Sequence, residues 1–67
     1  MDTIDAFEHE GHEIILLQED SGQYAVDIRA DDYDGAMIAG YTGFDTQEAA
    51  IRAGHTFIDG IKYGESL

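Results

Sequence analysis

The sequence predicts an α+β domain in which a small antiparallel sheet of three to four strands carries one C-terminal helix packed across one face. Polar and apolar residues alternate with a period of two between Gln23 and Ala30, as expected for a half-buried strand. Glycine and acidic residues divide the first two thirds of the chain into short segments. The last third repeats its apolar residues at helical spacing, and the 67 residues together predict a single domain, 1–67.

The first segment, Ile4–His9, is predicted to be a strand that turns at Glu10-Gly11 into the next one. A short helix is the alternative for residues 3–10, because Ile4 and Phe7 would then share one helical face. The pattern favours the strand.

Two further strands are predicted over His12–Gln18 and Gln23–Ala30, joined by a hairpin loop at Glu19–Gly22 in which the glycine supplies a positive φ. Four apolar residues in a row lie at the centre of the first of these strands. If a helix covers one face of the sheet, Ile15 and Leu17 point to the other face and are expected to be exposed there. Exposed apolar surface of that kind marks an interface.

The last strand is predicted over Ala36–Tyr41, after a turn at Asp31–Gly35. Gly40 and Gly43 are expected to weaken its far end and to favour a bulge there.

An α-helix is predicted from about Thr46 to Ile61. Asp45 is expected to cap its first turn, while Glu48 reaches back as the second half of a capping box. The helix should turn one apolar face to the sheet, with Phe57 packed against the alternating strand and small residues allowing a close approach. That face consists of Ala50, Ala53, Gly54, Phe57, Ile58 and Ile61.

The charge balance is strongly acidic. Fifteen Asp and Glu residues face only Arg29, Arg52 and Lys62, which gives a formal net charge of −12. Small soluble domains typically carry a net charge of about 2–8 in magnitude, and the excess opposes folding through self-repulsion. Nucleic acid and anionic membranes would be repelled, whereas a basic protein surface would be attracted. A salt-loving source organism, whose proteins are acidic throughout, is the alternative explanation.

The chain has no cysteine, so disulfides and thiolate metal sites are excluded. No apolar stretch approaches the ~20 residues of a membrane span, and the N-terminus does not resemble a signal peptide. These features predict a cytoplasmic protein.

Two segments contain candidate metal ligands. The zinc-protease motif needs two histidines four apart on a helix, but His9 and His12 are three apart around a glycine and are expected to diverge on a solvated turn. The acidic segment Asp31–Gly35 resembles part of a twelve-residue calcium loop, whose sixth residue is a glycine. With Gly35 at that position, Ala30 and Tyr41 occupy the first and last positions, where an aspartate and a glutamate are needed. The sequence therefore predicts no metal and no cofactor.

The sequence also lacks a suitable set of residues for nucleophilic catalysis. Ser21 and Ser66 lie in a predicted turn and in the tail, and His55 is expected to pack or to lie on the surface of the helix. A domain of this size has little room for an apolar cleft that could split the pKa values of two carboxyl groups. No catalytic residue is predicted, and the protein is not expected to be an enzyme.

The acidic residues form the predicted contact surface. Same-face residues on a strand are about 6.6 Å apart, which is close to the spacing of neighbouring phosphates along a nucleic-acid strand. A sheet lined with carboxylates can therefore imitate a nucleic-acid backbone to a protein that neutralises phosphates. Tyr33 is the predicted aromatic anchor among the partner-binding residues, which are Glu8, Glu10, Glu13, Asp27, Asp31, Asp32, Tyr33 and Asp34.

Two resemblances extend these expectations. A short acidic chain without cysteine or proline, with a small sheet and one helix, resembles phage-encoded anti-CRISPR proteins that act as DNA mimics or plug the DNA-binding channels of type I surveillance complexes. Locally, Phe7–Ile14, Gly43–Ala50 and Ile58–Gly60 are similar to small bacterial domains that resemble antitoxin sheets of the HicB type. Neither resemblance implies a catalytic residue.

The sequence thus predicts an inhibitor that binds a basic nucleic-acid-binding surface, with a type I CRISPR effector complex of a phage host as the implied partner. It is expected to be a monomer or weak homodimer that binds neither nucleic acid nor membranes directly. The alternative is an antitoxin-like or housekeeping interaction module, assembled through Ile15 and Leu17.

Overall fold

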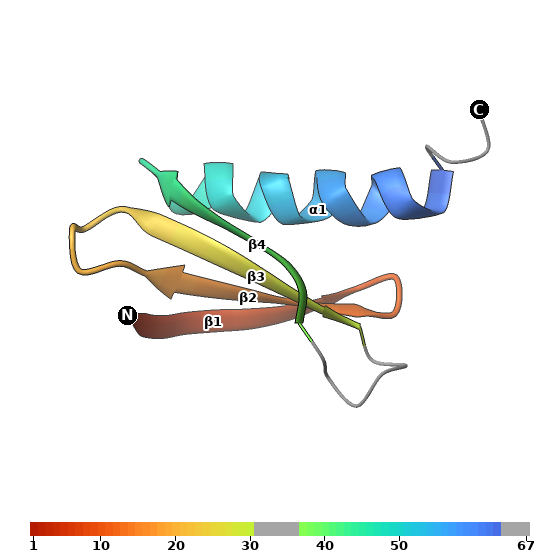
Figure 1. The fold of residues 1–67 in the computed structure, drawn as a ribbon, viewed down its shortest axis with the longest axis horizontal. Helices are drawn as coiled ribbons and strands as arrows, with labels where there is room; N and C mark the ends of the chain where they lie inside the picture. Colours follow the sequence, from red (N-terminus) through yellow and green to blue (C-terminus); the bar gives the residue numbers. More distant parts are fainter. Residues whose placement is uncertain (31–36, 64–67) are drawn as a thin grey trace.

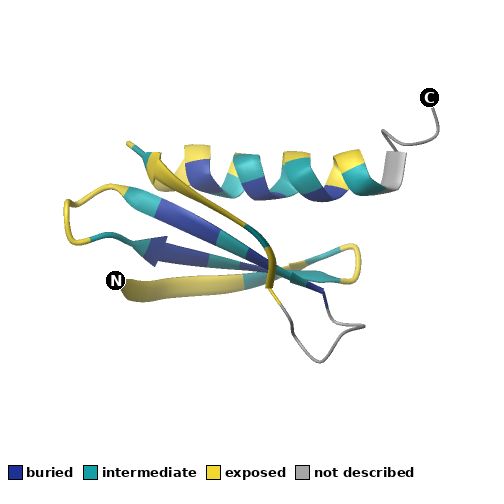
Figure 2. Ribbon diagram, in the orientation of Figure 1, coloured by how far each residue is buried: buried dark blue, intermediate teal, exposed yellow. Residues whose placement is uncertain are grey.

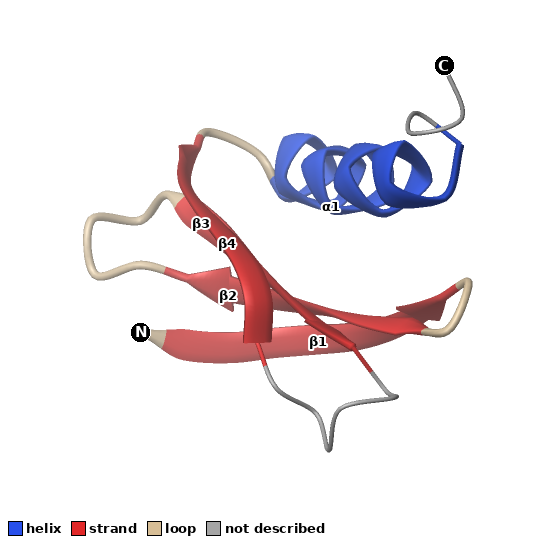
Figure 3. Cartoon of the chain, turned by 45° about the vertical axis from the view of Figure 1, so that its right-hand side comes forward, coloured by secondary structure: helices blue, strands red, loops and turns tan. Residues whose placement is uncertain are grey.

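The computed structural model describes residues 1–30 and 37–63, the last two by their backbone alone. Four antiparallel strands lie in the order β1-β2-β3-β4, and one helix crosses a single face of this sheet (Figures 1 and 3). The predicted α+β fold is confirmed. The elements are β1 (Asp2–His9), β2 (His12–Gln18), β3 (Tyr24–Ala30), β4 (Met37–Phe44) and α1 (Gln47–Tyr63).

The first hairpin decides between strand and helix for residues 3–10: residues 3–9 belong to strand β1, and Glu10 lies in the turn that follows. Glu10 and Gly11 both have positive φ, 49° and 80°, as a two-residue type I′ turn requires. This turn matches the twist of the flanking strands, so His9 pairs directly with His12. The pairing puts both histidines on the same face of the sheet, but their rings turn to different partners, Asp59 for His9 and the Glu10 carbonyl for His12.

The second hairpin follows the prediction. Gly22 has φ of 94°, and its N–H donates to the Glu19 carbonyl at 2.9 Å. The Glu19 N–H in turn donates to the Gln23 carbonyl at 2.8 Å, which closes the loop. Leu16 consequently lies opposite Val26, and both point to the helix side.

Strand β4 runs three residues beyond its predicted end. Its pairing with β3 shifts near both ends, and Gly43 has φ of 83° at the far one, which confirms the irregularity expected there. The Gly43 N–H donates to Glu19 Oε2 at 2.8 Å and joins the strand to the neighbouring hairpin loop. The predicted start at Ala36 and the turn at 31–35 lie outside the described residues.

The core lies between the sheet and α1 (Figure 2). Gly54 allows the helix to approach closely, because a Cβ atom there would lie 3.1 Å from Ile14 Cγ2. Phe57 is only half-buried, and its ring makes an edge-to-face contact with the Tyr41 ring, with the ring centroids 6.0 Å apart. Phe57 therefore packs at the rim of the core, while Ile58 lies at its centre. The side chains closest to complete burial in this cluster are Ile14, Leu16, Val26, Ile28, Ala50 and Ile58.

The open face of the sheet is less apolar than predicted. Leu17 is 9% exposed and therefore buried, and Ile15 is half-buried. Strand β2 is an inner strand, so Leu17 is flanked by Thr3 on one side and Ala25 on the other. The expectation that Ile15 and Leu17 form an exposed apolar pair is wrong for Leu17.

The helix cap also differs from the prediction. Thr46 caps α1, since its Oγ1 accepts the Ala49 N–H at 3.1 Å, while Asp45 Oδ1 accepts a hydrogen bond from Gln23 Nε2 at 3.2 Å. In a capping box the residue three positions after the cap bonds back to the cap residue. With Thr46 as the cap that position is Ala49, so Glu48 lies one residue too early to make this bond.

We expect Thr46→Ala to lower the free energy of unfolding by about 1 kcal/mol, because the Ala49 N–H loses its partner. Urea denaturation followed by circular dichroism measures this loss. Thr42→Ala, which removes the same hydroxyl and methyl groups from an exposed position on β4, is the control. A Thr46 variant as stable as the Thr42 variant would show that the cap is not at this residue.

Candidate functional site

Three of the predicted contact residues lie together on the face of the sheet that α1 leaves open. Ile14 and Ile28 point into the core beneath the helix, so their strand neighbours point the opposite way. Glu13 and Asp27 are such neighbours, and Glu8 joins them as the direct cross-strand partner of Glu13. The sheet therefore gathers three carboxylates from β1, β2 and β3 on one surface, which we call the acidic face.

The register fixes how these charges face one another. Glu8 lies opposite Glu13, and Glu13 lies opposite Arg29 on its other side. Like charges directly opposite each other on antiparallel strands destabilise a sheet. Asp27 lies opposite Gly40, and a Cβ atom at Gly40 would be 3.1 Å from Asp27 Oδ1. The glycine thus leaves the space that the carboxylate occupies.

Apolar groups border the carboxylates. Ile15 lies between Ala6 and Asp27 on the same face, and Met37, opposite Arg29, is 58% exposed. A flexible thioether beside charged groups suits an adaptable contact surface. The acidic face therefore combines fixed negative charge with a small apolar border.

Glu10 is the one other predicted contact residue that the structure describes, and it is not part of this face. Glu10 lies in the β1–β2 turn, where its Oε2 is 3.8 Å from His9 Nε2. Asp31, Asp32, Tyr33 and Asp34 lie outside the described residues.

We expect Glu8→Lys to raise the free energy of unfolding by up to about 1 kcal/mol, because it converts a like-charge pair with Glu13 into an opposite-charge pair. Thermal melts at low salt measure this gain, which should shrink as added salt screens the pair. Asp2→Lys makes the same change of net charge opposite Gln18 and is the control. A Glu8 variant less stable than the native protein would contradict the assigned register.

A second cluster joins the β1–β2 turn to α1. His9 Nε2 donates to Asp59 Oδ1 at 3.0 Å, and the His9 ring stacks on the His55 ring with centroids 4.3 Å apart and planes 5° from parallel. The hydrogen bond from His9 is the main cause that lowers the pKa of the Asp59 carboxyl below its ordinary value. His55 was expected either to pack or to lie on the helix surface, and its ring packs against His9.

This cluster was not predicted from the sequence, because Asp59 lies fifty residues after His9. One signal was present, since His55 and Asp59 are four residues apart and therefore share a helical face. Nothing in the local sequence indicates which strand that face meets. His12, in contrast, turns its Nδ1 to the Glu10 carbonyl at 3.1 Å.

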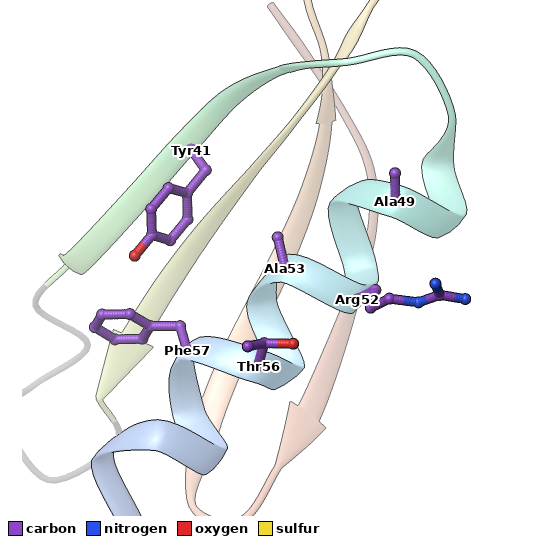
Figure 4. Close-up of a pocket in the computed structure, with 6 residues that line it drawn as sticks. All are labelled: Tyr41, Ala49, Arg52, Ala53, Thr56 and Phe57. Carbon is purple, nitrogen blue, oxygen red and sulfur yellow. The ribbon is translucent and has the colours of Figure 1, made fainter. Parts of the chain in front are cut away.

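Shallow grooves run along α1. One, of about 460 Å³, lies between Tyr41 of β4 and helix residues that include Arg52, Thr56 and Phe57 (Figure 4). Figure 4 shows the Tyr41 and Phe57 rings side by side at its edge. The lining is mainly apolar, and its side chains with polar groups are those of Tyr41, Arg52 and Thr56.

Comparisons with protein-family models, with curated proteins and with solved structures returned no match. Among the described residues, no helix is long and apolar enough to cross a membrane.

Proposed function

We propose that this protein is a non-catalytic binding module whose acidic face imitates a nucleic-acid backbone and occupies a basic surface of a nucleic-acid-binding protein. The observation that carries this proposal is the convergence of Glu8, Glu13 and Asp27 on the open face. These side chains come from three adjacent strands, so a rigid sheet fixes their spacing before any partner binds. Such preorganisation lowers the entropic cost of binding.

The energetics of the fold support the same proposal. The Glu8–Glu13 pair and the net charge of −12 both oppose folding. A partner that supplies lysine and arginine would relieve this repulsion and would be attracted from a distance, which speeds association. The same charge repels nucleic acid, so the protein should compete with DNA and should not bind it.

A type I CRISPR effector complex is the partner that the resemblance in size and charge implies. In this proposal the acidic face enters the DNA-binding channel and blocks it, as a phage-encoded inhibitor would do in the host cytoplasm. The test adds the protein to a purified type I complex bound to its fluorescent target duplex and follows fluorescence anisotropy. We expect the duplex to be released. Unchanged anisotropy at a large excess of protein would contradict the proposed partner, and direct DNA binding by the protein alone would contradict mimicry.

An apolar interaction module is the second candidate. Strand β4 is an edge strand that exposes Met37, Ile38 and Tyr41 by 58%, 40% and 40%. Edge strands with exposed apolar side chains pair readily with other chains, including a second copy. A complex formed in this way should persist as salt rises, whereas one formed by the acidic face should weaken steeply.

A further inference from the structure

Three side chains that can ligate a metal meet where the β1–β2 turn approaches α1. His9 Nε2, a Glu10 carboxylate oxygen and an Asp59 carboxylate oxygen all lie within 4.8 Å of one another. The turn lies at the same end of the molecule as the C-terminal half of α1 (Figure 1). Two of the three pairs have defined separations, 3.0 Å from His9 Nε2 to Asp59 Oδ1 and 3.8 Å from His9 Nε2 to Glu10 Oε2.

These separations match those between the ligands of one ion. Zinc binds imidazole nitrogen and carboxylate oxygen at about 2.0–2.2 Å. Two ligand atoms of one ion therefore lie about 3.0 Å apart when the ligand–zinc–ligand angle is a right angle, and about 3.4 Å apart when the coordination is tetrahedral. His9 Nε2 and Asp59 Oδ1 already lie at the first distance, and the 3.8 Å between His9 Nε2 and Glu10 Oε2 exceeds the second by about 0.4 Å.

We infer that His9, Glu10 and Asp59 form a binding site for one divalent transition-metal ion of the zinc, cobalt or nickel class. An imidazole with two carboxylates suits these ions, whereas calcium and magnesium prefer sites built from oxygen alone. Two carboxylates balance the charge of the ion, in a chain whose net charge is −12. Open coordination positions would be filled by water, because Glu10 and Asp59 are exposed.

The ligands are held before an ion arrives. His55 stacks on His9 and restrains its ring, while the hydrogen bond to Asp59 aims Nε2 at the carboxylate. Glu10 is held by the type I′ turn, where its φ of 49° is uncommon for a residue other than glycine. On binding, Nε2 gives up its proton and coordinates through its lone pair, so the ion replaces the hydrogen bond to Asp59.

This inference goes beyond the proposed function and does not depend on it. Among the described elements, the ion would add a coordinate link between the β1–β2 turn and α1, which the hydrogen bond from His9 to Asp59 already joins. Anything that binds the folded state alone stabilises it, so the melting temperature should rise with metal concentration.

The test titrates Zn²⁺, Ni²⁺ and Ca²⁺ separately into metal-stripped protein by calorimetry. We expect one Zn²⁺ or Ni²⁺ per chain and much weaker Ca²⁺ binding. His9→Phe keeps a ring against His55 but removes the nitrogen, and Asp59→Asn keeps a hydrogen-bond acceptor but removes the charge. Each should weaken Zn²⁺ binding by at least about 100-fold. Replacing a residue that only hydrogen-bonds to a metal ligand already weakens metal binding by about 10- to 100-fold, and the loss of a ligand itself should cost more. His12→Phe, in the same hairpin, is the matched control and should bind as the native protein does.

Nuclear magnetic resonance of the native protein provides a readout that needs no variant. The chain has three histidines, and one equivalent of Zn²⁺ should shift the ring signals of His9 while leaving those of His12 in place. The inference is overturned if Zn²⁺ and Ni²⁺ do not bind at about 1 mM, if His12→Phe weakens binding as much as His9→Phe, or if Ca²⁺ binds as tightly as Zn²⁺. If a variant fails to fold, Glu10→Gln in the exposed turn replaces it, and unchanged Zn²⁺ affinity there would overturn the assignment of Glu10.

Discussion

Replacing Ile58 with alanine should remove a large part of the free energy of unfolding. Ile58 is fully buried between α1 and the sheet, in the same cluster as Ile14 and Val26. Removing a buried isoleucine side chain beyond Cβ typically costs about 2–5 kcal/mol, and whole domains are stable by only about 5–15 kcal/mol. A chain of 67 residues falls near the lower end of that range, because it buries a smaller share of its surface.

Urea and thermal denaturation of Ile58→Ala, followed by far-ultraviolet circular dichroism, measure this effect. Ile4→Ala removes the same atoms from a side chain that is 39% exposed, and it should cost less than about 1 kcal/mol. Phe57→Ala should fall between the two, because Phe57 packs at the rim against Tyr41. If Ile58→Ala and Ile4→Ala melt within about 2 °C of each other, the core is assigned to the wrong helix face.

Neutralising the acidic face should abolish competition with DNA while leaving the fold intact. The variant combines Glu8→Gln, Glu13→Gln and Asp27→Asn, which keep the shape of each side chain. Charge contacts desolvated in a complex cost about 2–5 kcal/mol each when one partner is removed. Even at about 1 kcal/mol each, three lost contacts weaken binding by roughly 100-fold. Folding should be unharmed or slightly improved, because the Glu8–Glu13 repulsion disappears.

The control must separate the position of the charges from their number. Asp2→Asn, Asp20→Asn and Glu48→Gln together remove three charges from exposed positions in β1, the β2–β3 loop and α1. Both triple variants therefore have the same net charge. We expect the control to inhibit nearly as well as the native protein in the anisotropy assay. Equal loss of inhibition in both variants would mean that net charge alone acts, and equal retention would favour the apolar module at β4.

Elements specified by neighbouring residues could be predicted. The alternation from Tyr24 to Ile28 predicted β3, the helical repeat predicted α1, and the Glu10-Gly11 pair predicted the first turn. Each depends on interactions within one turn or one strand. The placement of Asp27 on the face opposite the core also follows from this periodicity, because a strand alternates its faces.

Features that depend on partners distant in the chain could not be predicted. Asp45 looked like the helix cap, but Gln23 lies beside it in the folded chain and Thr46 takes the cap instead. Leu17 looked exposed, but Thr3 and Ala25 flank it once β1 and β3 are in place.

Local periodicity and composition specify the fold class, the strand and helix segments and the acidic character of the protein. Which charges share a surface depends on the tertiary structure, which pairs Glu8 with Glu13 on the open face and brings Asp59 to His9 on the other. Sheet register and the direction in which α1 crosses the sheet are set by packing around Ile14, Gly54 and Ile58. That packing involves residues tens of positions apart, and no local pattern encodes it.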